Sequence, residues 1–279
     1  RVHEQQHVPA LVAEMLGNRR GVGRALQPQQ RRRVGRRGHH HGAATLQDVA
    51  GNVGVLVGHA LGRVEQQSLA FGDSDLISIG DEVVVAGTGG RQNSVAAHVV
   101  ARQEFAGYWE YLLDEAIFTA PSHPHWGGTA LIGQGGKLLG IGSLQVQQVL
   151  KDGQSEDINM MVPINLLKPI LDDMLTLGRP RQAARPWLGL YATEVDKQIT
   201  VAGIAARGPA RRADIRAGDV IVSVGEDPVR TLADFFRRVW AVGEAGTVVP
   251  LTILRKTQMM QIYLTSADRR EFLKGPVLH

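Results

Sequence analysis

The chain has 279 residues, enough for two modest domains of about 100–200 residues each. Hydrophobic residues make up 43% and charged residues 21%, a globular composition that excludes a chain disordered throughout. No apolar stretch reaches the roughly 20 residues that a membrane helix needs. Cysteine is absent, which excludes disulfides, thiolate metal sites and cysteine nucleophiles and leaves the compartment open.

The net charge of +4 is distributed unevenly along the chain. Residues 1–64 contain ten Arg against three acidic residues, whereas residues 65–279 contain 21 basic and 24 acidic residues. The first segment also lacks Ser, Ile, Lys and every aromatic residue. It is therefore a low-complexity basic segment with little from which to build a core.

Several interpretations of residues 1–64 stay open. An Arg-rich arm could bind nucleic-acid phosphates. A metal site at His39–His41 is disfavoured, because three adjacent imidazoles cannot converge on one ion without other ligands. Two further interpretations are that the segment is a disordered extension, or that it is the out-of-frame translation of a GC-rich gene. The chain begins at Arg1 rather than Met, so we expect a fragment of a longer protein. It shows no secretory signal.

From residue 65 to 178 the pattern predicts short strands followed by a helix. The predicted strands cover residues 83–86, 94–101, 116–120, 129–132, 138–141 and 158–162. Short strands at near-regular spacing indicate an antiparallel barrel or sandwich. Apolar residues then recur at helical spacing from Pro163 onward, and Gly178 is predicted to end that helix.

A second unit is predicted after a linker at residues 179–186, which contain two prolines and no periodicity. Its predicted strands cover residues 188–191, 199–204, 220–224, 248–254 and 258–264. Thr231 and Asp234 have the spacing of a capping box, so a helix is predicted to begin there. This unit covers residues 187–270, and residues 271–279 form a tail.

Certain motifs in these two units carry a family resemblance. In the first unit they are Leu69–Asp75 with Ile79–Val83, His123–Leu131, Gly136–Ile141 and Met160–Ile164. In the second they are Trp187–Leu190, Gly208–Ala210 and Ala217–Ile221. Their order and spacing resemble the HtrA-type (DegP-like) serine proteases with a C-terminal PDZ domain. The resemblance implies a mainly β fold, with a trypsin-like antiparallel β-barrel over residues 65–178 and a small α+β PDZ domain over 187–270.

The resemblance implies serine endopeptidase chemistry on unfolded protein segments, but the nucleophile is missing. This chemistry needs a Ser, a His base, an Asp and backbone donors for the oxyanion. Gly127 matches the nucleophile position, and glycine has no side chain that could attack a carbonyl. The only candidate base is His59, which lies too close to Gly72 to leave room for the strands that should carry the Asp. The backbone N–H groups of His125, Trp126 and Gly127 would form the oxyanion hole, and we expect a pseudoenzyme.

Peptide binding by the PDZ domain needs no catalytic side chain. By resemblance, the backbone N–H groups of Leu188, Gly189 and Leu190 receive the terminal carboxylate of a peptide, which adds as a strand beside the one starting near Leu190. Phe235 and Val239, on the helix that begins at Thr231, line the other wall of the groove or pack into the core. Both interpretations of these two side chains stay open.

The expected partners are unfolded or C-terminal peptide segments of proteins, and the family implies a homo-oligomer in the periplasm or cell envelope. No cofactor, metal, nucleic acid or membrane span is expected. One alternative function is a non-catalytic PDZ adaptor. The other is nucleic-acid binding through the Arg-rich residues 1–64.

Overall fold

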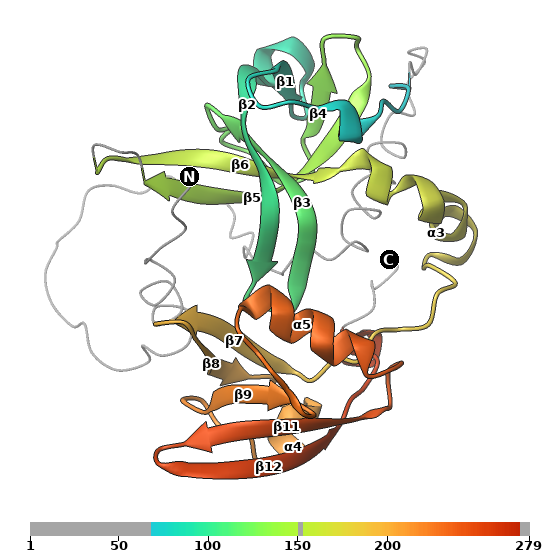
Figure 1. Cartoon of the computed structure of the whole chain (residues 1–279). Helices are drawn as coiled ribbons and strands as arrows, with labels where there is room; N and C mark the ends of the chain where they lie inside the picture. Colours follow the sequence, from blue (N-terminus) through green and yellow to red (C-terminus); the bar gives the residue numbers. More distant parts are fainter. Residues whose placement is uncertain (1–67, 150–152, 274–279) are drawn as a thin grey trace, which may run out of the picture. The chain divides into compact units, whose positions relative to one another are not determined.

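Six antiparallel strands close into a barrel in the order β1-β2-β3-β6-β5-β4 (Figure 1). The computed structural model describes residues 68–149 and 153–273. The barrel strands are β1 (Glu82–Ala86), β2 (Ser94–Gly107), β3 (Tyr111–Ala120), β4 (Ala130–Gly133), β5 (Leu138–Val149) and β6 (Ser155–Pro163). Short 3₁₀ turns, η1 (Ser74–Leu76) and η2 (Gly90–Asn93), flank β1. The predicted antiparallel barrel is confirmed.

The barrel core follows from side-chain alternation along the strands. In β1, Val83 and Val85 are buried while the alternating Glu82 and Val84 are exposed, as the two-residue period of a strand requires. Val85 packs in one cluster with fully buried residues of other strands, including Ile117. Burying one such side chain contributes about 1.5–3 kcal/mol.

β2 and β3 form a hairpin that is longer than the sequence predicts. β2 pairs with β1 only up to His98, and β3 pairs with β6 only from Ile117. Between these limits the two strands pair with each other alone, as far as Gly107 opposite Tyr111. The sequence pattern missed this extension because part of its apolar surface packs against the other domain rather than inside the barrel.

The single helix predicted from Pro163 to Gly178 is wrong in its first half. Two 3₁₀ turns, η3 (Ile164–Leu166) and η4 (Lys168–Ile170), precede a short α-helix, α3 (Leu171–Leu177). Pro169 lies inside η4, where its missing N–H interrupts the helical hydrogen-bond ladder. Gly178 does end α3, with φ of 66° and its N–H donated to the Met174 carbonyl 3.1 Å away.

The second domain is an antiparallel sheet in the order β12-β11-β9-β8-β7, with the short β10 paired to β9. Its elements are β7 (Leu190–Val195), β8 (Gln198–Ile204), α4 (Pro209–Arg212), β9 (Val220–Val224), β10 (Asp227–Pro228), α5 (Leu232–Ala241), β11 (Val248–Arg255), β12 (Gln258–Thr265) and η5 (Arg269–Phe272). Figure 1 shows α5 running along this sheet, and β7 is the edge strand. The described residues of both domains fall in one compact unit.

The predicted capping box starts α5. The Thr231 hydroxyl accepts the Asp234 N–H at 3.0 Å. The Asp234 carboxylate in return accepts the N–H of Arg230, at 3.1 Å, one residue before the cap position. Such caps contribute about 1 kcal/mol. Within the described ranges, no helix is long and apolar enough to cross a membrane.

Candidate functional site

His123 holds the first half of the loop that resembles the nucleophile loop. This residue is 2% exposed, and its Nδ1 accepts the backbone N–H of His125 at 3.0 Å. Because Nδ1 accepts, Nε2 carries the proton and donates to the Asn93 carbonyl at 3.0 Å. The His123 backbone N–H donates to Oδ1 of Asn159 at 2.6 Å. Both ring nitrogens of His123 are therefore occupied by hydrogen bonds that hold the loop in place.

The second half of this loop is held by β5. Gly128 donates its N–H to the Gly142 carbonyl at 2.9 Å, and Gly142 donates to the Thr129 carbonyl at 2.8 Å. The Thr129 hydroxyl donates to the Trp126 carbonyl at 2.9 Å. A Cβ on Gly142 would lie 2.1 Å from that same carbonyl oxygen. The close approach of loop and strand therefore requires glycine at this position.

The nucleophile position on this framework holds no reactive group. Gly127 occupies it, and a Cβ built there would meet no atom within 4 Å. Of the three amides predicted for the oxyanion hole, that of His125 donates to His123. Within the part of the chain that the structure describes, the amides of Trp126 and Gly127 donate no hydrogen bond. The oxyanion hole stays a prediction.

Two sequence predictions fall on residues that the structure does not describe. His59, the candidate base, is one of them, and the Arg-rich segment of residues 1–64 is the other. Both therefore stay predictions, as does the nucleic-acid alternative that depends on the segment.

Two carbonyl groups of the predicted carboxylate loop, Trp187–Leu190, accept hydrogen bonds from the rest of the PDZ domain. The Leu188 carbonyl accepts the N–H of Ala210 and the Gly189 carbonyl accepts that of Ala205, both at 2.8 Å. Gly189 has φ of +72°, and a Cβ there would lie 2.9 Å from Cα of Gly208. Both carbonyls are therefore engaged within the PDZ domain, and the N–H groups of the loop are the groups predicted to receive a carboxylate.

A carboxyl group already lies at this loop, and it belongs to Glu110 in the turn between β2 and β3. Leu188 donates its N–H to Oε1 of Glu110 at 3.2 Å, and the backbone N–H groups of Gly189 and Leu190 act to lower the pKa of the same carboxyl group. Burial raises the pKa of Glu110 to about 8, against the lowering effect of these donors and of Arg269. Sequence reasoning missed Glu110 because nothing in the pattern links a barrel turn to a loop almost 80 residues later.

The predicted peptide groove would lie between the edge strand β7 and α5. Phe235 is 0% and Val239 is 2% exposed, and both pack in the cluster that contains Leu188, Leu190 and Ala192. Ala106 and Leu112, from the β2–β3 hairpin, also pack against this cluster. Whether Phe235 and Val239 contact a peptide stays a prediction, since both are covered in this structure.

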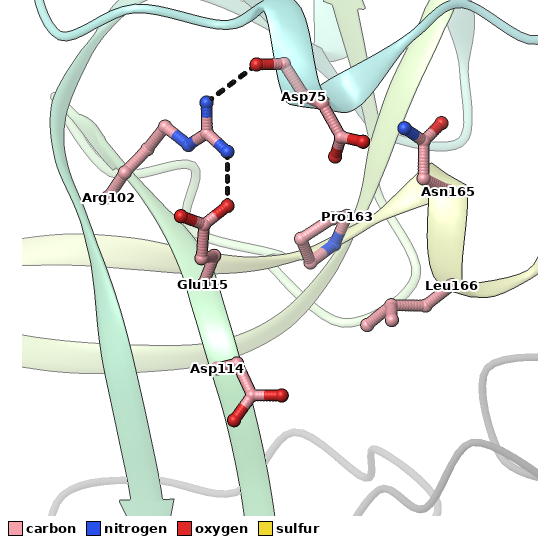
Figure 2. Close-up of a pocket in the computed structure, with 7 residues that line it drawn as sticks. All are labelled: Asp75, Arg102, Asp114, Glu115, Pro163, Asn165 and Leu166. Carbon is pink, nitrogen blue, oxygen red and sulfur yellow. Dashed lines mark hydrogen bonds and ion pairs between the residues drawn. The ribbon is translucent and has the colours of Figure 1, made fainter.

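A separate polar cluster fixes the base of the β2–β3 hairpin to the barrel. Figure 2 shows Arg102 and Glu115, from the two hairpin strands, facing Asp75. One guanidinium nitrogen of Arg102 donates to the carbonyls of Asp75 (2.9 Å) and Ile77 (2.7 Å), and the other pairs with Glu115 at 2.5 Å. The pocket around them is lined by Asp75, Arg102, Asp114, Glu115, Pro163, Asn165 and Leu166. In the described ranges, no group of three His or acidic side chains could hold a metal ion.

Comparison with known proteins identifies one domain of the chain and a group of relatives. Residues 186–265 match the PDZ domain family model. A probable periplasmic serine endoprotease DegP-like from Brucella suis is 28% identical over 215 residues, covering 71% of this chain and 40% of its own. The serine protease Do-like HtrB of Bacillus subtilis is 26% identical over 168 residues, 54% of this chain and 36% of its own.

Among solved structures, an HtrA-type protease AlgW with a decapeptide is 21% identical. It covers 77% of this chain and 67% of its own, with a TM-score of 0.48. The chain spans about 40% of the length of the DegP-like relatives. Residues 186–265 are thus a PDZ domain, in a chain related to the HtrA-type serine proteases.

Proposed function

We propose that this chain binds the free C-termini of unfolded protein segments in its PDZ groove and does not hydrolyse them. The observation that carries the proposal is the carboxyl group of Glu110, which accepts the N–H of Leu188 in the loop Trp187–Leu190. A loop N–H that donates to the carboxyl group of Glu110 can donate in the same way to the carboxylate at the end of a peptide.

The edge of β7 supplies the rest of the binding mode. An incoming peptide adds as a strand antiparallel to β7, because that edge has no other strand of its own sheet beside it. The N–H of Ala192 points to this edge, where it donates to a carbonyl from outside the sheet. Carboxylate capture sets the register of the peptide, and the backbone pairing provides affinity that is independent of its sequence.

The absence of hydrolysis follows from Gly127. Acyl transfer needs an oxygen or sulfur nucleophile, and glycine offers neither. Loss of the nucleophile in serine proteases removes several orders of magnitude of rate even when the rest of the site is intact. The loop at His123–Thr129 is then a rigid turn of the barrel rather than a reaction centre.

A direct binding test compares one peptide in two chemical forms. A fluorescent peptide with an apolar last residue and a free C-terminus should bind about tenfold or more tightly than its C-terminal amide, because a charged acceptor on backbone N–H groups is lost. Fluorescence anisotropy measures both affinities. Equal affinity of the two forms would contradict the proposal.

The predicted lack of peptidase activity has its own test. A serine-reactive fluorophosphonate probe should leave the chain unlabelled in intact-mass spectrometry, with trypsin as the positive control. Covalent labelling at any serine would overturn this part of the proposal and leave the peptide-binding part standing.

The proposal extends to the compartment. The Brucella relative is described as periplasmic, as is the DegP of Salmonella typhimurium, 24% identical over 215 residues. These names support a periplasmic or envelope location. Fractionation of cells that express the whole natural protein tests it, and recovery with cytoplasmic markers would contradict it.

A further inference from the structure

The turn of the β2–β3 hairpin has an unusual residue at its last position. Gly107 pairs with Tyr111, so Tyr108, Trp109 and Glu110 form a three-residue loop. Such loops end in the left-handed region, and Glu110 has φ of 63°. Glycine or asparagine is favoured there, because a Cβ is disfavoured at positive φ. A glutamate at this position suggests that its carboxylate has a role.

The same turn pairs with the edge strand of the PDZ domain. Ala192 in β7 donates its N–H to the Tyr108 carbonyl at 3.0 Å. Two residues further along the turn, Glu110 lies on the N–H of Leu188. The Tyr108 and Tyr191 rings meet edge to face with centroids 6.0 Å apart. Tyr108 and Glu110 thus contact β7 and its preceding loop as an added strand would.

A third set of contacts holds the hairpin strands to α5. Arg237 forms ion pairs with Glu104 of β2, at 2.6 Å, and with Asp114 of β3. Ala106 and Leu112, one on each strand, pack against the PDZ core. The hairpin therefore contacts the carboxylate loop, the edge of β7 and α5, which are the three elements that border the predicted groove.

We propose that the β2–β3 turn, Tyr108–Glu110, is an internal ligand of the PDZ groove, with the Glu110 side chain in the place of a peptide's C-terminal carboxylate. The inference rests on the proposed function, since it concerns the same groove. It adds that the groove is closed by the chain itself, so that an external C-terminus binds only after it displaces the turn.

This arrangement lowers the apparent affinity for external peptides. The turn is tethered to the domain it occupies, so it competes at a high effective concentration. An external peptide then binds only the open fraction of molecules, and its apparent dissociation constant rises in inverse proportion to that fraction. If one molecule in ten is open, the affinity is weakened about tenfold.

The test is the substitution Glu110→Ala, which removes the carboxylate and keeps the Cβ and its left-handed backbone. Glu226→Ala is the matched control, because Glu226 is an exposed residue of the PDZ domain. Anisotropy with the free-carboxylate peptide should show binding about tenfold tighter for Glu110→Ala and unchanged for Glu226→Ala. The amidated peptide should bind weakly to the natural chain and to both variants.

Hydrogen exchange provides a readout without any peptide. The Ala192 amide, bonded to Tyr108, should exchange slowly in the natural chain and faster in Glu110→Ala, and added free-carboxylate peptide should slow it again. If Glu110→Ala does not fold, Arg237→Ala loosens the hairpin from α5 and should show the same two effects at smaller size.

The outcomes separate the inference from the proposed function. Equal affinity and equal Ala192 exchange in the natural chain and Glu110→Ala would overturn the internal ligand, while discrimination between the free and amidated peptide would keep the proposed function. Equal binding of both peptide forms to Glu110→Ala would overturn the proposed function itself.

Discussion

The loops at His123–Thr129 and Trp187–Leu190 are the two places where we predict backbone N–H donors, yet they depend on the sequence in different ways. In the barrel loop the framework is fixed by His123, Asn159 and the close approach of Gly142, but the chemistry of the related proteases needs one oxygen that Gly127 lacks. In the PDZ loop the chemistry belongs to the backbone itself. A function supplied by main-chain donors survives side-chain replacement, and one supplied by a single side-chain atom does not.

The largest effect is expected where the backbone of the PDZ loop itself is changed. Gly189→Val places a branched side chain at φ of +72° and within 2.9 Å of Cα of Gly208. Left-handed strain alone costs roughly 1–2 kcal/mol, and the overlap adds about 1–3 kcal/mol. Anisotropy should detect no binding of the free-carboxylate peptide. Binding within a factor of two of the natural chain would show that this loop is not the carboxylate site.

The next effect is a pH dependence of peptide binding to the PDZ domain. Burial raises the pKa of Glu110 to about 8 from its ordinary 4.5, so the docked turn holds a proton that the undocked turn has lost between these values. Docking therefore weakens as the pH rises through this window, by up to about tenfold per pH unit, and becomes flat above about 8. The pKa of the nearby Tyr108 phenol is itself raised by burial.

The measurement is the affinity of the free-carboxylate peptide, lacking His, between pH 6 and 9. Affinity for the natural chain should increase up to about pH 8, whereas Glu110→Gln, which cannot titrate, should give a flat profile. An equal increase in peptide affinity with pH in Glu110→Gln would assign the pH dependence to another group.

A smaller effect is expected in the framework of the barrel loop. Gly142→Ala drives a Cβ against the Trp126 carbonyl and should lower the free energy of unfolding by about 1–3 kcal/mol. Urea denaturation measures this, and Gly135→Ala is the control because a Cβ there meets nothing within 4 Å. Peptide binding should be unchanged in both variants. Equal stability of the two would show that the barrel loop and β5 are not packed as described.

The smallest effect is expected at the nucleophile position. Gly127→Ser adds a side chain where the space is open, so the free energy of unfolding should change by no more than about 0.5 kcal/mol. The same urea experiment measures it. A loss of more than about 2 kcal/mol, the size of overpacking, would mean that the loop no longer has the form of a nucleophile loop.

The sequence predicts the elements more completely than the site. Strand alternation, the Thr231 cap and the stop at Gly178 are local signals, and the structure confirms each. The helix predicted after Pro163 fails locally at Pro169. The contact between Glu110 and Leu188 could not be predicted, because it joins two domains, and periodicity within one domain carries no information on it. The long β2–β3 hairpin was missed for the same reason.

The central claim, binding without hydrolysis, is tested most directly by one time course. A peptide labelled at its N-terminus and free at its C-terminus is mixed with the chain, and its fluorescence anisotropy is followed overnight. The account predicts a rise on mixing that then stays constant. A rise that decays as shorter labelled fragments appear, or no rise at all, would contradict it.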